Sequence, residues 1–251
     1  MNSFIAWIGG KKLLRKKIIE QFPDPNNIER YIEVFGGAGW VLFGKEPGKH
    51  LEVFNDIDNN LINLYRCIKY HCGELQKELD WLVVSRQQFF DYKEQYEMRG
   101  LTDIQRAARY LYVIKASFGA DRKTFGTNKK NLINTIDYLP EVTARLKDVV
   151  IENLDYQRLI KVYDRPKALF YLDPPYLGTE KYYDSGFCLD DHRQLCTILK
   201  GIKGKFILSY NDDSYIKEIY KDFYIEEVAR NNNLACKNGS NSYKEIIIKN
   251  F

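Results

Sequence analysis

Apolar residues fall along the chain in seven short runs, several of them separated by stretches with helical periodicity. Runs of about four to eight apolar residues are typical of strands that are buried on both faces of a parallel sheet. They predict strands at 30–35, 50–55, 149–153, 168–172, 205–210, 223–228 and 243–249. Strands of this kind, alternating with helices, predict an α/β fold with a Rossmann-like, seven-stranded sheet.

The stretch between the second and third predicted strands is much longer than one crossover requires. A whole strand–helix–strand unit needs only ~30 residues or somewhat more. The periodicity of this stretch instead predicts helices at about 60–80, 86–98 and 102–116. We therefore expect an inserted, mainly helical domain at 60–148, within a first domain formed by 1–59 and 149–251.

A glycine-rich turn, "FGGAG", follows the first predicted strand. Gly37 and Gly39 allow a tight turn and a close approach of the backbone to a ligand. The dinucleotide fingerprint G-x-G-x-x-G would need a third glycine at the position of Leu42, so the sequence does not favour hydride transfer. The turn therefore indicates a nucleotide-like ligand of another kind.

The second predicted strand ends in "VFNDID", about twenty residues after the glycine turn. An acidic side chain at this place can accept hydrogen bonds from a ribose diol. Aspartates also cap helices, and the helical pattern "NNLINLY" follows directly. We expect Asp56 to be the ribose ligand and Asp58 to be the cap; the alternative is that either one serves only as a cap.

The fourth predicted strand stops abruptly at the tetrapeptide "DPPY", from Asp173 to Tyr176. Proline cannot donate to a strand ladder, so two prolines end the strand. Ligands of open α/β sheets bind outside the carboxyl ends of the strands, which places this tetrapeptide beside the glycine turn and Asp56. An acceptor-rich turn with an aromatic side chain suits a planar amine, such as the exocyclic amine of adenine.

The nitrogen of a ring-conjugated amine is a poor nucleophile because its lone pair is delocalised into the ring. The Asp173 carboxylate and the Pro174 carbonyl can accept its two N–H groups, and Pro175 helps to hold that carbonyl in place. Tyr176 can stack on the base. A carboxylate with an ordinary pKa of ~3.9 is a weak base, so we expect Asp173 to orient the amine and stabilise its developing positive charge. The alternative is a strand-ending turn without a catalytic part.

An aromatic residue, two glycines and a lysine precede the first helical pattern, in "WIGGK". Followed in order by "FGGAG", "NDIDNNLINLY" and "LDPPY", this segment resembles the Dam-like family of DNA adenine N6-methyltransferases, and the resemblance spans nearly the whole chain. It implies a methyltransferase sheet, a target-recognition domain in the insertion, and methyl transfer from S-adenosylmethionine to adenine N6 in duplex DNA by base flipping. The expected catalytic residues are Asp173, Pro174, Pro175 and Tyr176, and the expected cofactor-binding residues are Trp7, Lys11, Phe35, Gly37, Gly39, Asp56 and Asp173.

Members of this family that read GATC carry a basic residue just before the tryptophan, where this chain has Ala6. Their recognition hairpin is also longer than anything between Phe118 and Asn131. The resemblance therefore does not extend to GATC as the target sequence.

Positive charge is concentrated at 104–131, which holds seven Lys or Arg against one acid, although the whole chain has a net charge of only +4. Basic residues mixed with aromatics and glycines suit phosphate contacts and base stacking. Lys or Arg can also pair with a base edge, and an aromatic wedge can fill the space of an extruded base. We expect phosphate contacts from Arg106, Arg109, Lys129 and Lys130, a base-edge contact from Arg122 or Lys123, a wedge at Phe118, and a further DNA contact from Lys115.

Two alternatives stay open for this basic stretch. Arg106 and Arg109 can equally form one solvated helix face, and Phe118 can belong to the core of the insertion. The five cysteines lack the paired short spacing of structural zinc sites, so we expect reduced thiols and no metal.

No apolar run approaches the ~20 residues that span a bilayer, so we expect no membrane contact and a cytoplasmic protein. The sequence indicates no obligatory protein partner. Two rival functions remain: a methyltransferase acting on protein glutamine or RNA, and a DNA-binding module without activity.

Overall fold

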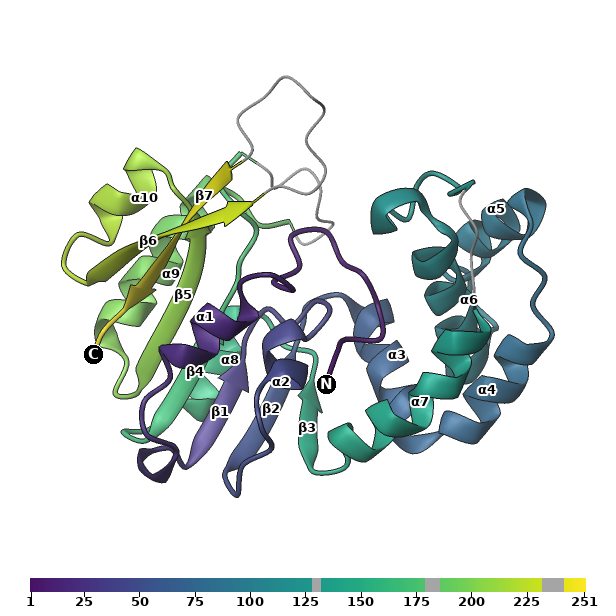
Figure 1. The fold of residues 1–251 in the computed structure, drawn as a ribbon, viewed down its shortest axis with the longest axis horizontal. Coiled ribbons are helices and arrows are strands. Elements are labelled where there is room, and N and C mark those ends of the chain that lie inside the picture. The colour runs from purple at the N-terminus through teal and green to yellow at the C-terminus, as the bar shows by residue number, and fades with distance from the viewer. Residues whose placement is uncertain (128–131, 179–185, 232–241) are drawn as a thin grey trace.

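A seven-stranded sheet forms the centre of the molecule, with the strand order β3-β2-β1-β4-β5-β7-β6 (Figure 1). The computed structural model describes residues 1–127, 132–178, 186–231 and 242–251. Strands β1 to β5 run parallel, and β7 is antiparallel to both of its neighbours. All seven predicted strands are confirmed, as β1 Arg30–Glu33, β2 Leu51–Asn55, β3 Val149–Glu152, β4 Ala168–Leu172, β5 Lys205–Asn211, β6 Tyr224–Asn231 and β7 Ser242–Lys249.

Side chains of the central strands alternate between two hydrophobic clusters, one on each face of the sheet. Along β4, Leu169 and Tyr171 belong to one cluster, while Phe170 and Leu172 belong to the other. This is the period of two that a pleated strand imposes. Because both faces are covered, all five residues of β4 are buried, which explains the continuous apolar run in the sequence.

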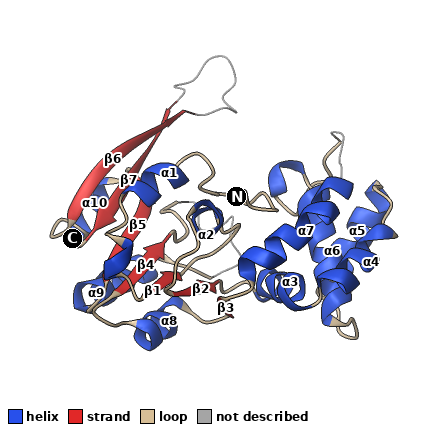
Figure 2. Cartoon of the chain, turned by 60° about the horizontal axis from the view of Figure 1, so that its bottom comes forward, coloured by secondary structure: helices blue, strands red, loops and turns tan. Residues whose placement is uncertain are grey.

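Helices cover both faces of the sheet (Figure 2). One face carries the short helices α1 Arg15–Glu20 and α2 Trp40–Gly44, whose buried residues join the first cluster. The other face carries α8 Tyr156–Tyr163, α9 Leu189–Gly201 and α10 Ser214–Ile219. The result is the three-layer arrangement of an α/β fold.

The segment between β2 and β3 forms a group of helices beside the β3 edge of the sheet (Figures 1 and 2). The predicted helices at 86–98 and 102–116 are confirmed, and the predicted helix at 60–80 is two helices because the chain turns at His71. None of the helices in the described ranges is long and apolar enough to cross a membrane. The group consists of α3 Asn59–Tyr70, α4 Cys72–Asp80, α5 Arg86–Gln95, α6 Asp103–Ala116 and α7 Ile133–Leu146.

Helix α7 has no counterpart among the predicted helices, and Pro140 in its middle explains why. A proline cannot donate to the carbonyl four residues earlier, which leaves the Ile136 oxygen without its helical donor. Gln76 of α4 replaces that donor, with its Nε2 2.9 Å from the Ile136 oxygen. A contact between helices therefore stabilises a helix that the local sequence does not favour.

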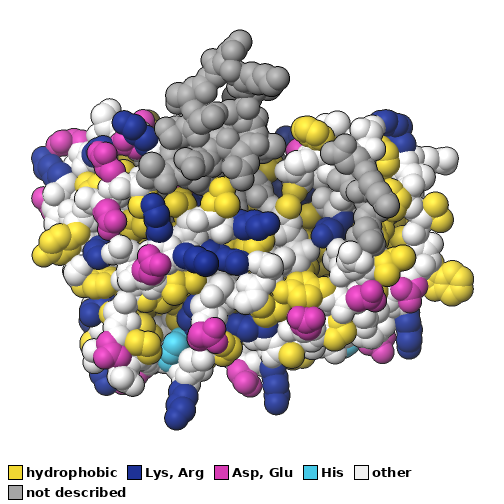
Figure 3. All heavy atoms as spheres, viewed as in Figure 1, with side chains coloured by type: hydrophobic (Ala, Val, Ile, Leu, Met, Phe, Trp, Pro, Cys, Tyr) yellow, Lys and Arg dark blue, Asp and Glu magenta, His cyan; other side chains and the backbone are white. Residues whose placement is uncertain are grey.

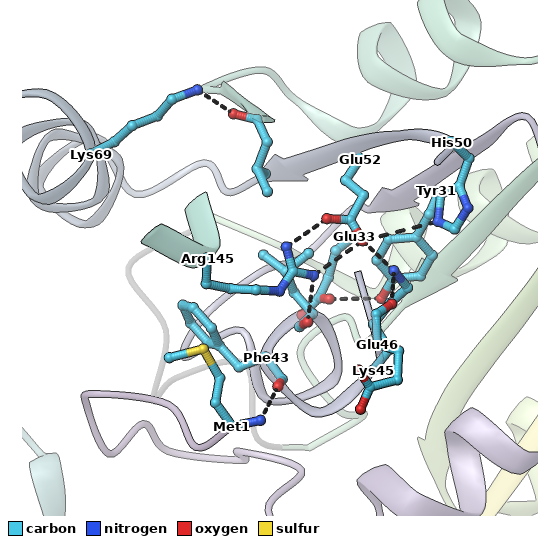
Figure 4. A network of polar contacts seen from close by, with 12 residues as sticks. Met1, Tyr31, Glu33, Phe43, Lys45, Glu46, His50, Glu52, Lys69 and Arg145 are labelled. Atoms are coloured by element: carbon cyan, nitrogen blue, oxygen red, sulfur yellow. Dashed lines mark hydrogen bonds and ion pairs between the residues drawn. The ribbon is translucent and has the colours of Figure 1, made fainter. Parts of the chain in front are cut away.

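A buried ion-pair network joins α7 to the amino-terminal edge of the sheet (Figure 4). Arg145 donates to both carboxylate oxygens of Glu52 on β2, at 2.6 and 3.1 Å, and to the Leu42 carbonyl at 2.9 Å. Lys45 also pairs with Glu52, which is 6% exposed. Burial on its own raises the pKa of Glu52, but Arg145 and Lys45 outweigh it and the pKa is lowered. This carboxylate is therefore held in its charged form.

We expect the substitution Arg145→Met to lower the free energy of unfolding by about 3 kcal/mol. Loss of one partner of a buried ion pair costs ~3–5 kcal/mol, and the remaining Lys45 places this case at the lower end. Urea unfolding measures the change. Lys200→Ala, which removes the exposed pair with Asp222, is the matched control and should change stability little. A loss in Arg145→Met no larger than in this control would contradict the assignment.

Candidate active site

The carboxyl ends of β2, β1 and β4 meet at one edge of the sheet, and each carries a predicted site segment. Neighbouring parallel strands present their ends together, so the turn after β1 lies between Asp56 and Asp173. A cavity of about 290 Å³ opens there. The structure places all of the predicted cofactor residues in its wall: Trp7, Lys11, Phe35, Gly37, Gly39, Asp56 and Asp173.

Lys11 reaches this edge from the amino-terminal segment. Its Nζ lies 2.8 Å from Asp173 Oδ1 and 3.8 Å from Glu245 Oε2. The same ammonium donates to the Gly9 carbonyl at 2.8 Å and lies 4.6 Å from the centre of the Tyr176 ring. Lys11 is 4% exposed, so it brings a desolvated positive charge to the Asp173–Tyr176 tetrapeptide.

Asp173 follows β4, where the two buried prolines end the strand. Burial raises the pKa of the Asp173 carboxyl, and Lys11 acts in the opposite direction. The Ser209 hydroxyl on β5 also donates to Asp173 Oδ1, at 2.9 Å. Lys11 and Ser209 thus share one carboxylate oxygen, and no described residue donates to the other.

Tyr176 and the prolines complete the tetrapeptide. Pro175 lines the cavity, while Pro174 and Tyr176 lie just beside it. The Tyr176 hydroxyl donates to Glu245 Oε2 on β7 at 2.6 Å, which fixes the direction of the ring. Its ring centre lies 5.9 Å from that of Tyr210. The tyrosine ring is therefore held in a fixed direction beside the Lys11 ammonium.

The glycine turn has the backbone that glycine permits. Gly37 and Gly39 have φ of +49° and +65°, in the left-handed region. A Cβ on Gly37 would lie 2.9 Å from Cδ1 of Trp7, so the tryptophan packs directly on this glycine. The Gly37 amide donates to Asp56 Oδ2 at 2.8 Å, which joins the turn after β1 to the acid after β2.

The two aspartates after β2 have different surroundings. Asp58 accepts from the Leu61 amide at 3.0 Å, which confirms that it caps α3. Asp56 accepts from the Asp58 and Gly37 amides, and burial raises its pKa to about 6. Asp56 therefore lines the cavity as a half-buried carboxyl group with a raised pKa.

A second cavity, of about 430 Å³, lies on the other side of Phe35, and Phe35 and Ile57 line both cavities. Three aromatic rings lie in its wall, with Tyr156 and Phe187 each 5.8 Å from the Phe35 ring between centres. Asp155 and Asp191 add carboxyl groups to this wall. We call the first cavity, which Glu33, Asp56 and Asp173 line, the polar cavity, and the second, with its three aromatic rings, the aromatic slot.

The predicted DNA-contact residues are more scattered than the cofactor residues. Arg106 pairs with Asp103 at 3.0 Å, Arg109 donates to Gln95 at 2.8 Å, and Lys115 donates to the Phe4 carbonyl at 3.3 Å. Lys129 and Lys130 lie outside the described residues. None of these contacts tests DNA binding, so these assignments stay predictions.

The loop after α6 carries the other three candidates. Phe118 is 63% exposed, so the alternative that it packs in the core is wrong. Lys123 is also exposed, whereas Arg122 turns inward and lines the polar cavity. Of these two candidates for a base-edge contact, Lys123 is therefore the one exposed to solvent, which the sequence did not show.

Sequence reasoning missed two buried acids of this site, Glu33 on β1 and Glu245 on β7. Glu33 lines the polar cavity and accepts from the Tyr31 hydroxyl at 2.7 Å, and burial raises its pKa to about 8. A charged residue inside an otherwise apolar strand, as in "RYIEVF", is the signal that could have found it. Within the described ranges, no cluster of His, Cys, Asp or Glu could hold a metal ion.

Comparisons with known proteins agree with this geometry. Residues 7–234 match the model of the D12 class N6 adenine-specific DNA methyltransferases. The chain is 27% identical to the type II methyltransferase M.MjaIII of Methanocaldococcus jannaschii over 293 aligned positions, covering 100% of this chain and 99% of the relative. It is 25% identical to the DNA adenine methylase of Haemophilus influenzae over 250 positions, covering 86% and 82%. Since the family model spans most of the chain, this protein belongs to the D12 class of N6 adenine-specific DNA methyltransferases.

Proposed function

We propose that this methyltransferase flips its target adenine out of duplex DNA and receives the N6 amine between the Asp173 carboxylate and the Pro174 carbonyl. The observation that carries the proposal is the Lys11–Asp173 ion pair at the wall of the polar cavity. This ion pair supports the proposal because the Lys11 ammonium favours the charged, acceptor form of Asp173 beside the polar cavity.

S-adenosylmethionine is the methyl donor of this family and supplies an electrophilic methyl group on a positively charged sulfur. The polar cavity suits it because acidic side chains lie in its wall, those of Glu33, Asp56, Asp58, Glu97 and Asp173. Glu33, with a pKa of about 8, is mostly protonated at neutral pH, so the negative charge comes from the other acids. We assign Asp56 to the ribose diol, and the aromatic slot beside Phe35 to the adenine ring. The remaining cofactor candidates, Trp7, Lys11, Gly37 and Gly39, would enclose the rest of the donor.

The chemistry required of the protein is to make the lone pair of an aromatic amine available. Asp173 Oδ2 accepts one N–H and the Pro174 carbonyl accepts the other, which favours a pyramidal nitrogen. Lys11 and Ser209 hold the carboxylate through Oδ1, so the acceptor is oriented before the base arrives. Tyr176, fixed by Glu245, stacks on the base. Asp173 stabilises the positive charge that develops on the nitrogen and takes the proton after methyl transfer.

The helical segment at 60–148 would recognise the target, while 1–59 and 149–251 bind the donor. Figure 3 shows Lys and Arg side chains in the middle of one face, between the sheet and the helices. Phe118 and Lys123 are exposed on the loop after α6, so we assign Phe118 to the space left by the flipped adenine and Lys123 to a base edge. The phosphates would be contacted by Arg106, Arg109, Lys115, Lys129 and Lys130.

The substitution Asp173→Ala tests the catalytic assignment. We expect turnover to fall by about 10²-fold or more, since a preorganised polar partner is lost, while donor binding is largely retained. Tritiated methyl transfer to duplex DNA measures turnover, and calorimetry with S-adenosylhomocysteine measures binding. Asp212→Ala is a matched control because Asp212 follows β5 at the same sheet edge and pairs with Lys217 at 2.6 Å. Undiminished turnover in Asp173→Ala would remove this residue from the mechanism.

Lys11→Met should shift the acid side of the pH–rate profile to higher pH. Burial raises the pKa of Asp173, and Lys11 opposes the shift, so loss of the ammonium raises that pKa further. Because the carboxylate is the acceptor form, the variant loses activity at a higher pH than the wild-type enzyme does. The profile of kcat/KM between pH 5 and 9, with the neighbouring Lys12→Met as control, measures the shift. An acid limb identical to that of the wild-type enzyme would refute it.

Donor affinity should weaken by about tenfold between pH 7 and pH 5 if the ribose binds the Asp56 carboxylate. The pKa of Asp56 is raised to about 6, so most of these carboxyl groups are protonated at pH 5 and cannot accept two hydrogen bonds. Asp56→Asn should bind S-adenosylhomocysteine more weakly at pH 7 and with a flatter pH dependence. Calorimetry at the two pH values gives both results, and an unchanged slope in the variant argues against the assignment.

A further inference from the structure

The loop that follows α6 has an unfavourable backbone. Gly119, Ala120 and Arg122 have φ of +58°, +61° and +57°. The left-handed region is uncommon for residues with a Cβ, so Ala120 and Arg122 need compensating contacts. Backbone hydrogen bonds close the loop at its base, where the Phe118 amide donates to the Thr124 carbonyl at 2.7 Å.

Contacts of the Arg122 side chain supply the compensation. Arg122 Nη1 lies 3.0 Å from Asp58 Oδ2 and 2.6 Å from the Tyr110 hydroxyl. The Tyr110 hydroxyl in turn donates to Asp58 Oδ2 at 2.6 Å. The guanidinium also lies over the indole ring of Trp7, at 4.8 Å from its centre. Arg122 is therefore pinned by a carboxylate, a phenol and an aromatic face, with its side chain 15% exposed.

These partners belong to the donor cavity. Trp7, Asp58, Tyr110 and Arg122 all line it. Trp7 packs on Gly37, and the Asp58 amide donates to Asp56 Oδ1 at 2.9 Å. Arg122 thus completes the wall of the cavity assigned to the donor, and it lies on the same loop as the exposed Phe118 and Lys123.

We propose that Arg122 is a positioning residue that couples the two substrates: the donor in its cavity and DNA on the loop each strengthen the binding of the other. The inference rests on the proposed assignments of the cavity and of the loop. A donor that holds Trp7 and Asp58 in place favours the loop conformation that Arg122 maintains. DNA that binds this conformation favours the same arrangement of Trp7 and Asp58, and linkage makes the two effects equal.

Variants of Arg122 and Asp58 should lose different amounts of the coupling, because Arg122 makes both an ion pair with Asp58 and a stacking contact with Trp7. Lysine can pair with Asp58 but has no planar group to lie over Trp7, so Arg122→Lys should keep part of the coupling. Asp58→Asn removes the charge that holds Arg122, and asparagine still caps a helix well, so α3 is preserved. Lys123→Ala is the matched control, since this exposed neighbour lies on the same loop but does not line the cavity.

The experiment measures the affinity of a duplex carrying the methylated sequence, with and without saturating S-adenosylhomocysteine. The target sequence comes from methylation-sensitive sequencing of DNA from cells that express the protein. In the wild-type enzyme we expect the ligand to tighten DNA binding by about tenfold. In Arg122→Ala this ratio should fall to about one, with an intermediate ratio in Arg122→Lys.

Asp58→Asn should lower the ratio as Arg122→Ala does, and the double variant should show no additional loss because both residues act through one contact. Lys123→Ala should weaken DNA binding and keep the wild-type ratio. A wild-type ratio in Arg122→Ala, or no coupling in the wild-type enzyme, would overturn the inference. A wild-type enzyme that does not bind S-adenosylhomocysteine would instead overturn the donor assignment.

Discussion

Burial at the end of a central strand disfavours the charged form of the Asp173 carboxyl, and Lys11 is the cation held beside it that opposes this effect. Its ammonium lies 2.8 Å from Asp173 and reaches the site from a segment far from β4 in the sequence. Taking both charges out of water is costly, so the geometry around them has to be well satisfied. The Gly9 carbonyl, the Ser209 hydroxyl and Glu245 provide those additional contacts.

The charge cluster around this ion pair also brings β7, two places from β4 in the sheet, into the site. Glu245 belongs to β7, which lies antiparallel next to β5, and it fixes the Tyr176 hydroxyl. Tyr176 therefore depends on a strand from the carboxyl-terminal end of the chain for its orientation. Tyr176 and Asp173, the proposed stacking surface and acceptor, are positioned by the same charge cluster, so neither is independent of Lys11.

Most of the sheet and the residues that line the polar cavity could be predicted because their signals are local. Apolar runs mark the strands, glycines with a positive φ mark the turn after β1, and prolines mark the end of β4. The sequence left open which of Asp56 and Asp58 caps the following helix, and Asp58 caps it, as expected. The family then decides between the rival functions, since its members methylate adenine in DNA.

What the sequence could not reveal depends on contacts between distant residues. Tyr176 and Glu245 are 69 positions apart, and Glu52 and Arg145 are 93 apart. Helix α7 contains a proline whose cost is met by Gln76 of another helix. No local pattern encodes such pairings, because each partner alone reads as an ordinary polar residue on a helix or strand.

Two of the contacts that hold the segment between β2 and β3 to the sheet lie at opposite ends of β2. At the carboxyl edge of the sheet, Asp58 begins α3 and binds Tyr110 and Arg122. At the amino edge, Arg145 of α7 binds Glu52. A helical group held at one point could pivot about it, whereas attachments at opposite ends of β2 restrict that motion. A base presented by the loop after α6 would therefore reach the same place relative to Asp173 on each encounter, which near-attack geometry requires.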